Sequence, residues 1–131
     1  MIRAFLILAC LALPAAAQAQ SCADAQNQME LTQCAYDEWQ IADAELNEVY
    51  PRVMAILKAQ DAELDPIYQG GPAALRDAQR AWVTFRDKTC EAEGFAMRGG
   101  SAEPMVVAGC LRTLTEERIG HLYGMLDAYG G

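Results

Sequence analysis

Histidine is almost absent from this chain of 131 residues, in which His121 is the only one. Of the five cysteines, four follow residue 20, and no two of them form a C-x-x-C pair. Zinc sites are built from closely spaced cysteine and histidine ligands, and redox-active thiols usually occur in C-x-x-C motifs. The sequence therefore favours neither a zinc site nor thiol redox catalysis, and we predict no cofactor.

A pattern for nucleophilic catalysis is also lacking. Ser101 and His121 would lie on one helix about 30 Å apart, given a rise of about 1.5 Å per residue, whereas a nucleophile must contact its base. The Gly99-Gly100-Ser101 turn is too short for a phosphate-binding loop, and no lysine follows it. Acidic residues are plentiful, but none is placed in an evident cleft as a glycosidase would require. We predict that the protein is not an enzyme.

Long apolar runs are missing except at the N-terminus. Arg3 precedes an apolar run over residues 4–13, and small residues follow up to Ala19. This order is typical of a secretory signal peptide, and the run is shorter than the about 20 residues that span a bilayer. We predict a signal peptide over residues 1–19, with cleavage after Ala17 as the alternative.

The remaining residues, 20–131, are predicted to form one domain without a transmembrane segment. The predicted location is the periplasm or the medium outside the cell. A lipid anchor through Cys10 is the alternative, although the residues before it fit a lipoprotein processing site poorly.

Positive charge is scarce. The chain has 10 Lys and Arg residues against 18 Asp and Glu residues, which gives a net charge of −8 at pH 7. Removal of residues 1–19 takes away one cation and no acid, so the exported chain would carry −9. Such a charge repels nucleic-acid phosphates and attracts basic proteins, and salt weakens both effects. We expect a basic protein partner and no nucleic acid.

Strand patterns and repeats are absent, whereas helical periodicity is strong. Asn27 and Glu30 have the form of a capping box, and apolar residues then recur every three or four positions to about residue 60. Pro51 lies inside this pattern and predicts a kink or a break over residues 47–51. Residues 61–72 contain several turn formers and are interpreted as a connection with one short turn at residues 62–64.

Two further helices are predicted, over about residues 73–93 and 101–128. Gly94 suits the C-terminal cap of the first, and Ser101 suits the N-cap of the second. The expected inward-facing residues of the two helices are Leu75, Ala78, Trp82, Phe85 and Thr89, and Val107, Leu111, Leu114, Arg118, Leu122 and Met125. We predict an all-α fold, a small antiparallel bundle of about three main helices stapled by disulfides.

The four cysteines of the exported domain predict a disulfide framework, as expected for a small exported protein. Cys90 and Cys110 lie on either side of the predicted turn, so an antiparallel hairpin brings them to similar heights. Cys22 lies in a polar segment that could fold back along the helix of Cys34. We favour Cys22–Cys34 with Cys90–Cys110. The crossed pairings stay open because the start of the first helix could lie near the same turn.

Taken together, these residues resemble the LprI-like family, which is named after a lysozyme inhibitor. The matching motifs are Cys22 and Cys34 with Met29-Glu30 between them, residues 42–47 with Tyr50, residues 79–82, residues 85–87 with Cys90, Gly100-Ser101, and Cys110 with Leu114-Thr115 and Arg118. The resemblance covers nearly all of the exported chain, and Pro51 directly after Tyr50 is a departure. It implies a helical, disulfide-bonded protein of the bacterial envelope.

Two functional hypotheses follow from the resemblance. The first is an exported envelope protein that inhibits lysozyme by binding a basic muramidase, an encounter that an acidic charge favours. The alternative is a periplasmic structural or interaction module that inhibits nothing. The predicted partner-binding site is the turn around Gly100, Ser101 and Glu103, because a turn held by a disulfide keeps its shape.

Overall fold

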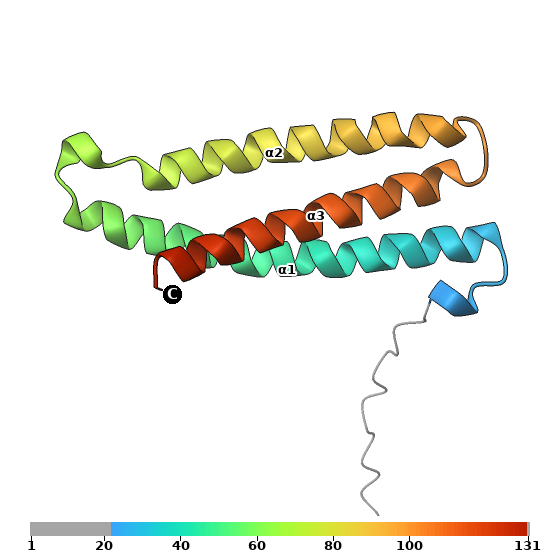
Figure 1. The fold of residues 1–131 in the computed structure, drawn as a ribbon, viewed down its shortest axis with the longest axis horizontal. Coiled ribbons are helices and arrows are strands. Elements are labelled where there is room, and N and C mark those ends of the chain that lie inside the picture. The colour runs from blue at the N-terminus through green and yellow to red at the C-terminus, as the bar shows by residue number, and fades with distance from the viewer. Residues whose placement is uncertain (1–21, 131) are drawn as a thin grey trace, which may run out of the picture.

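The computed structural model describes residues 22–130, and over this range the fold is all-α, as predicted (Figure 1). The long helices are α1 (Gln28–Glu63), α2 (Gly71–Gly94) and α3 (Glu103–Ala128). One-turn 3-10 segments precede or join them: η1 (Cys22–Asp24), η2 (Pro66–Tyr68) and η3 (Phe95–Met97). The predicted signal peptide, its boundary and Cys10 lie outside the described residues.

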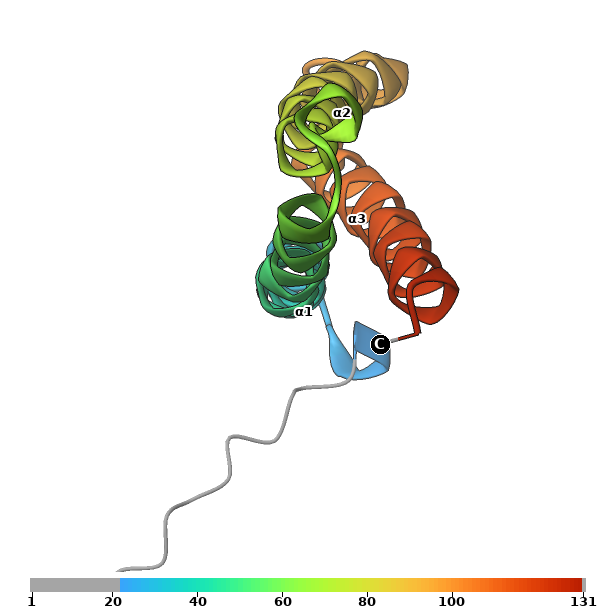
Figure 2. The same ribbon diagram turned by 90° about the vertical axis from the view of Figure 1, so that its left-hand side faces the viewer.

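The three helices pack unequally. α2 runs antiparallel to α1, and α3 turns back, so that α1 and α3 run in the same direction (Figure 1). α1 packs most extensively against α3, α2 packs mainly on α3, and α1 and α2 contact each other least (Figure 2). Over residues 22–130, none of the helices combines the length and the apolar character needed to cross a membrane.

The apolar core forms two clusters. The larger one lies mainly between α1 and α3 and consists of Ala42, Leu46, Val49, Val53, Leu57, Leu75, Ile119, Leu122 and Leu126. The smaller one surrounds Cys90, Cys110 and Leu111 near the turn between α2 and α3. Steps of three and four along each helix place these residues on one face. The inward stripe predicted for α2 is wrong at two positions, Ala78 and Phe85, which are both exposed. Phe85 is 58% exposed, whereas its neighbour Arg86 is 8% exposed.

The start of α1 is capped as predicted. The Asn27 side chain accepts a hydrogen bond from the Glu30 N–H at 3.0 Å. The Glu30 carboxylate in turn accepts from the Gln26 N–H at 2.7 Å, one residue before the position that a standard capping box uses. Both backbone donors are therefore satisfied before the first helical turn is complete.

Pro51 does not break α1, which is continuous from Gln28 to Glu63. The predicted break is therefore wrong. A proline in a helix leaves the carbonyl four residues earlier, here that of Asn47, without its usual donor. Both Pro51 and Asn47 lie on the exposed side of the helix, where water can bond that carbonyl.

The connection between α1 and α2 differs from its prediction. α1 extends through residues 62 and 63, and the short turn comes later, at Pro66–Tyr68. The Asp61 carboxylate accepts the backbone N–H groups of Gly70 at 2.7 Å and Gly71 at 3.3 Å. A side chain from α1 thus caps the start of α2, which has no capping side chain of its own.

The two caps predicted at the second turn are wrong. Gly94 has a φ of −58° and continues the right-handed helix of α2. A Cβ at this position would lie 2.6 Å from Cγ2 of Val107, so Gly94 allows α2 and α3 to approach closely. Ser101 does not cap α3, which begins at Glu103 without a capping side chain at its preceding residue. The left-handed residue of this turn is Gly99, with a φ of 78°.

The favoured disulfide pairing is the one that the structure has. Cys22 is bonded to Cys34, with 5.5 Å between their Cα atoms, and Cys90 to Cys110, with 5.4 Å. The first bond fastens η1 to α1. The second joins the end of α2 to the start of α3, next to the turn.

Candidate functional site

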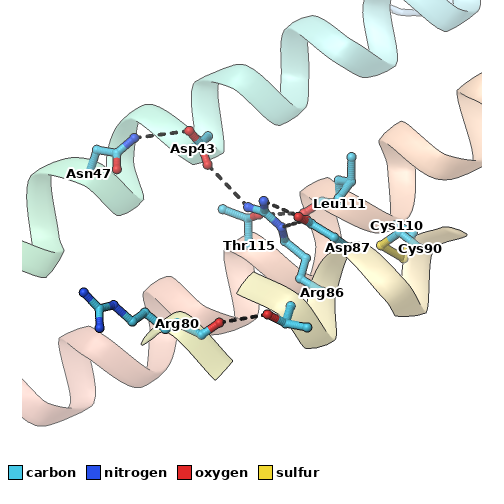
Figure 3. Close-up of polar contacts among 10 residues, drawn as sticks. Asp43, Asn47, Arg80, Arg86, Asp87, Cys90, Cys110, Leu111 and Thr115 are labelled. Carbon is cyan, nitrogen blue, oxygen red and sulfur yellow. Dashed lines mark hydrogen bonds and ion pairs between the residues drawn. A yellow bond between two sulfur atoms is a disulfide. The ribbon is translucent and has the colours of Figure 1, made fainter. Parts of the chain in front are cut away.

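Arg86 is a buried cation in the middle of the bundle. Its guanidinium lies 2.9 Å from the Asp87 carboxylate and 3.5 Å from that of Asp43 (Figure 3). It also lies over the rings of Trp39 and Trp82, at 5.7 and 5.0 Å from their centroids. A charge loses its hydration on burial and needs such compensation, here from two carboxylates and two aromatic faces. Arg86 therefore connects α1 with α2, the two long helices that contact each other least.

Asp43 is oriented by its own helix. Asn47 lies one turn further along α1, and its amide donates to the Asp43 carboxylate at 3.1 Å. The other oxygen of that carboxylate faces the guanidinium of Arg86 (Figure 3). The 42–47 and 85–87 motifs noted in the sequence therefore meet in one polar contact.

A second guanidinium comes from α3. Nε of Arg118 donates to the Gln79 side chain at 2.9 Å, and its guanidinium lies 5.9 Å from the Trp82 ring centroid. One of its other nitrogens, Nη2, is buried without a hydrogen-bond partner. Burial lowers the pKa of Arg118 from its ordinary value, and Tyr50 opposes this change. The Trp82 ring is thus close to two cations from different helices.

A hollow of about 330 Å³ lies beside this cluster, between α1 and α2. We call it the α1–α2 hollow. Its lining residues are Asp43, Leu46, Asn47 and Tyr50 from α1, and Arg76, Gln79, Arg80, Trp82, Val83 and Arg86 from α2. The sequence reasoning did not predict this site. The inward position of Arg86 could have been predicted from sequence. Residues 75, 82, 86 and 90 are spaced so that they share one face of a helix, and Arg86 lies in that series between Trp82 and Cys90.

The predicted partner-binding residues lie elsewhere, in the turn between η3 and α3. The Glu103 carboxylate accepts the Gly99 N–H and an Arg98 guanidinium N–H, both at 2.8 Å. These bonds lower the pKa of Glu103 from its ordinary value, and the bond from the Gly99 backbone has the largest effect. The Gly100 N–H donates to the Met97 carbonyl at 2.8 Å, and Ser101 is exposed. The structure brings these residues together, and Glu103 also lines another hollow whose wall includes Trp39, Arg86 and Asp87.

Apolar side chains are exposed around this turn. Phe95 is 56% and Met97 50% exposed, and the Arg98 guanidinium lies over the Phe95 ring at 4.6 Å from its centroid. Ser101 and Pro104 also border a shallow hollow with the start of α1, where Met29 is exposed. Exposed apolar groups that lie together are typical of contact surfaces.

One group of potential metal ligands gathers within the described residues, namely Cys22, Cys34 and Glu38, whose ligand atoms lie within 4.8 Å of one another. The two sulfur atoms are bonded to each other in the disulfide. Because thiolates, not disulfides, bind metal ions, this group does not form a metal site.

Three comparisons with known proteins each give a match. The model of the family described as "Lysozyme inhibitor LprI" matches residues 19–122. An uncharacterized protein of Rhizobium meliloti (strain 1021) is 45% identical over 127 residues, which cover 93% of this chain and 91% of the relative. The crystal structure of a DUF1311 family protein from Pseudomonas putida KT2440 superposes with a TM-score of 0.63 at 21% identity, over 76% of this chain and 94% of that one. This last likeness shows the shared fold.

Proposed function

Because the chain belongs to the lysozyme inhibitor LprI family, we propose that it is an exported envelope protein that binds and inhibits a lysozyme. The family match over residues 19–122 is the observation that carries the proposal. The family is one of inhibitors, which act by binding, and this agrees with the prediction of a protein that is not an enzyme.

The charge of the chain supports an encounter with a basic muramidase. Common lysozymes are basic, whereas this chain carries a net charge of −8. Glu45, Glu48 and Glu117 are exposed and form no ion pair within the described part of the chain, so their charges face the solvent uncompensated. Complementary charge raises the rate of encounter and is screened by salt.

A lysis assay tests the proposal directly. The purified, disulfide-intact protein is added to a bacterial cell-wall suspension with lysozymes of several structural types, and the fall in turbidity is followed at low and high salt. We expect slower lysis with at least one basic lysozyme, and a weaker effect at high salt. Unchanged lysis at low salt with every type would contradict inhibition and would favour the non-inhibitory interaction module.

We place the contact with the lysozyme at the turn that contains Gly100, Ser101 and Glu103. The Glu103 hydrogen bonds and the Cys90–Cys110 disulfide hold this turn in one shape, and a contact surface that is already ordered loses little entropy on binding. The exposed side chains of Phe95 and Met97 add apolar area beside it.

Two variants with the same charge change test this placement. Ser101→Arg puts a long cation on the exposed turn, against a basic partner. Gln60→Arg puts the same side chain on an exposed position near the end of α1. We expect Ser101→Arg to weaken inhibition by about tenfold or more, the size of an interface hot spot, and Gln60→Arg to leave it within about twofold. Equal inhibition by the two variants would refute the placement and leave the family function standing.

Export is tested separately. We propose that residues 1–19 are removed on the way to the periplasm or the medium. Mass spectrometry of the protein purified from the periplasm or the medium of an expressing bacterium should show a chain that starts at Gln20. An intact, uncleaved chain in the cytoplasm would contradict export, and a lipid-modified Cys10 would support the anchored alternative.

A further inference from the structure

We propose that the α1–α2 hollow binds a small ligand that carries a carboxylate. The proposal concerns a different part of the molecule from the turn, and it does not depend on inhibition of lysozyme. It follows from the distribution of charge, from the hydrogen-bonding groups that the fold leaves free, and from the size of the hollow.

The hollow is positive in a protein that is otherwise strongly negative. Three arginines, Arg76, Arg80 and Arg86, line it with a single acid, Asp43. The chain as a whole has 18 acidic and 10 basic residues. An excess of cations at one place in such a chain attracts anions there.

The arginines at the rim are not needed for the fold. Arg86 is compensated by Asp43 and Asp87, but the Arg80 guanidinium forms no ion pair or hydrogen bond within the described residues. The bond drawn at Arg80 in Figure 3 is made by its backbone carbonyl, which accepts from the Thr84 hydroxyl at 3.2 Å. Arg76 forms one loose pair with Asp77 at 4.0 Å, and both of these side chains are exposed.

The spacing of these two arginines suits one planar anion. Arg76 and Arg80 are four residues apart on α2, so their side chains project from the same side of the helix. Arginine presents paired N–H donors that match the two oxygens of a carboxylate. The two guanidiniums can therefore hold a carboxylate at the mouth of the hollow.

Other groups that line the hollow can bind polar atoms next to that carboxylate. The Gln79 oxygen is occupied by Arg118, which leaves its NH₂ group to donate. The Asn47 NH₂ group is occupied by Asp43, which leaves its oxygen to accept. The Tyr50 hydroxyl also lines the hollow. These groups match the amide and hydroxyl groups of an N-acylated amino acid or an acidic amino sugar.

The size of the hollow limits the ligand. Its volume of about 330 Å³ lies at the lower end of the range of known small-molecule sites, about 300–1,000 Å³. Leu46, Val83 and Trp82 supply apolar wall between the polar groups. One sugar ring or one acylated amino acid fits this space, and a longer chain would have to leave it through the open side.

Calorimetric titration or NMR with four probes tests the proposal. N-acetylmuramic acid and N-acetylglucosamine differ by a carboxylate-bearing side group, so they form a matched pair. N-acetylalanine carries the carboxylate on a peptide scaffold, and inorganic phosphate is an anion of different shape. We expect saturable binding of N-acetylmuramic acid or N-acetylalanine and no binding of N-acetylglucosamine. Whichever carboxylate binds more tightly shows whether the ligand is an amino sugar or an acylated amino acid. Absence of binding by both carboxylates, or equally tight binding of phosphate, would overturn the proposal.

Two variants assign the binding to the hollow. Arg80→Gln removes the unpaired guanidinium and should weaken carboxylate binding about tenfold or more, the loss expected for a charge-assisted contact. Lys58→Gln removes one exposed cation outside the hollow and should leave binding within about twofold. Because both residues are exposed, circular dichroism should show the same helix content for each. Equal binding by the two variants would show that the hollow is not the site.

Discussion

Arg86 shows how a small bundle can bury a charged side chain. Its charged and aromatic partners come from two helices: Asp43 and Trp39 from α1, and Asp87 and Trp82 from α2. Both carboxylates keep contact with water, since their side chains are 40% and 52% exposed. The pair is therefore only half desolvated, and the cost of burial falls mainly on the guanidinium.

Replacement of Arg86 by methionine keeps much of the apolar stem and removes the charge. We expect the free energy of unfolding to fall by about 2 kcal/mol, less than the about 3–5 kcal/mol known for fully buried pairs, because the two acids can still be hydrated. Urea denaturation followed by circular dichroism measures the change. Lys88→Met is the control, because Lys88 is 75% exposed and paired only with Glu91, so its loss should cost under about 0.5 kcal/mol. Equal losses for the two variants would refute this role of Arg86.

Among the described glycines, Gly94 is the one where an added Cβ would meet its neighbour at the shortest distance. In Gly94→Ala, the new methyl group would lie 2.6 Å from Val107, whose branched side chain has little freedom to move. We expect a loss of about 1–2 kcal/mol, since overpacking outweighs the better helix propensity of alanine.

The matched control for Gly94→Ala is Gly120→Ala in α3. A Cβ at Gly120 has no contact within 4 Å, so alanine should gain about 0.5–1 kcal/mol from helix propensity alone. Thermal unfolding of both variants should therefore shift in opposite directions. A stabilised Gly94→Ala protein would mean that α2 and α3 can move apart at this point without cost.

The helices themselves could be predicted from sequence, with the ends of α2 and α3 within about two residues, but the caps of these two helices could not. Periodicity places the three helices because burial repeats every three or four residues. The caps are different, since Asp61 of α1 caps α2 across a turn of several residues. Similarly, an apolar scale ranks Phe85 above Arg86, although the neighbours from α1 make Arg86 the buried one. Both errors concern contacts between elements, which a local pattern does not contain.

Asp61→Ala tests the cap that α1 provides for α2. Its loss leaves the Gly70 and Gly71 N–H groups to water, and we expect a destabilisation of about 1 kcal/mol, the usual value of a helix N-cap. Glu63→Ala is the control, because Glu63 is an exposed acid of the same turn that forms no ion pair in the described part of the chain. Chemical denaturation of both variants gives the comparison. Similar midpoints would mean that water replaces the Asp61 carboxylate fully.

At the scale of the whole molecule, α2 packs mainly on α3 and is also held by polar or covalent contacts along its length. Asp61 holds its start, Arg118 and Arg86 hold its central part, and the Cys90–Cys110 bond holds its end. Between these attachments α2 lies apart from α1, and this separation leaves the α1–α2 hollow. The sequence predicts the bundle and its disulfides. It does not predict the hollow, because the distance between two helices depends on all the side chains packed between them.

The two disulfides should differ in how easily they are reduced. Cys90 is fully buried and Cys110 is 7% exposed, whereas Cys22 is half-buried in the short segment η1 before α1. A thiolate must reach a sulfur atom to reduce the bond, so access sets the rate. We expect a mild reductant to open Cys22–Cys34 first, which frees η1 and leaves the helix content unchanged. Reduction of Cys90–Cys110 should come later and cost about 2–4 kcal/mol of stability.

Alkylation followed by mass spectrometry gives the order in which the two disulfides open. The control is the chain unfolded in urea, in which both bonds should open at similar rates. Loss of Cys90–Cys110 at the same rate in the folded protein would mean that this end of the bundle opens readily, which would remove the fixed turn on which the proposed lysozyme contact depends.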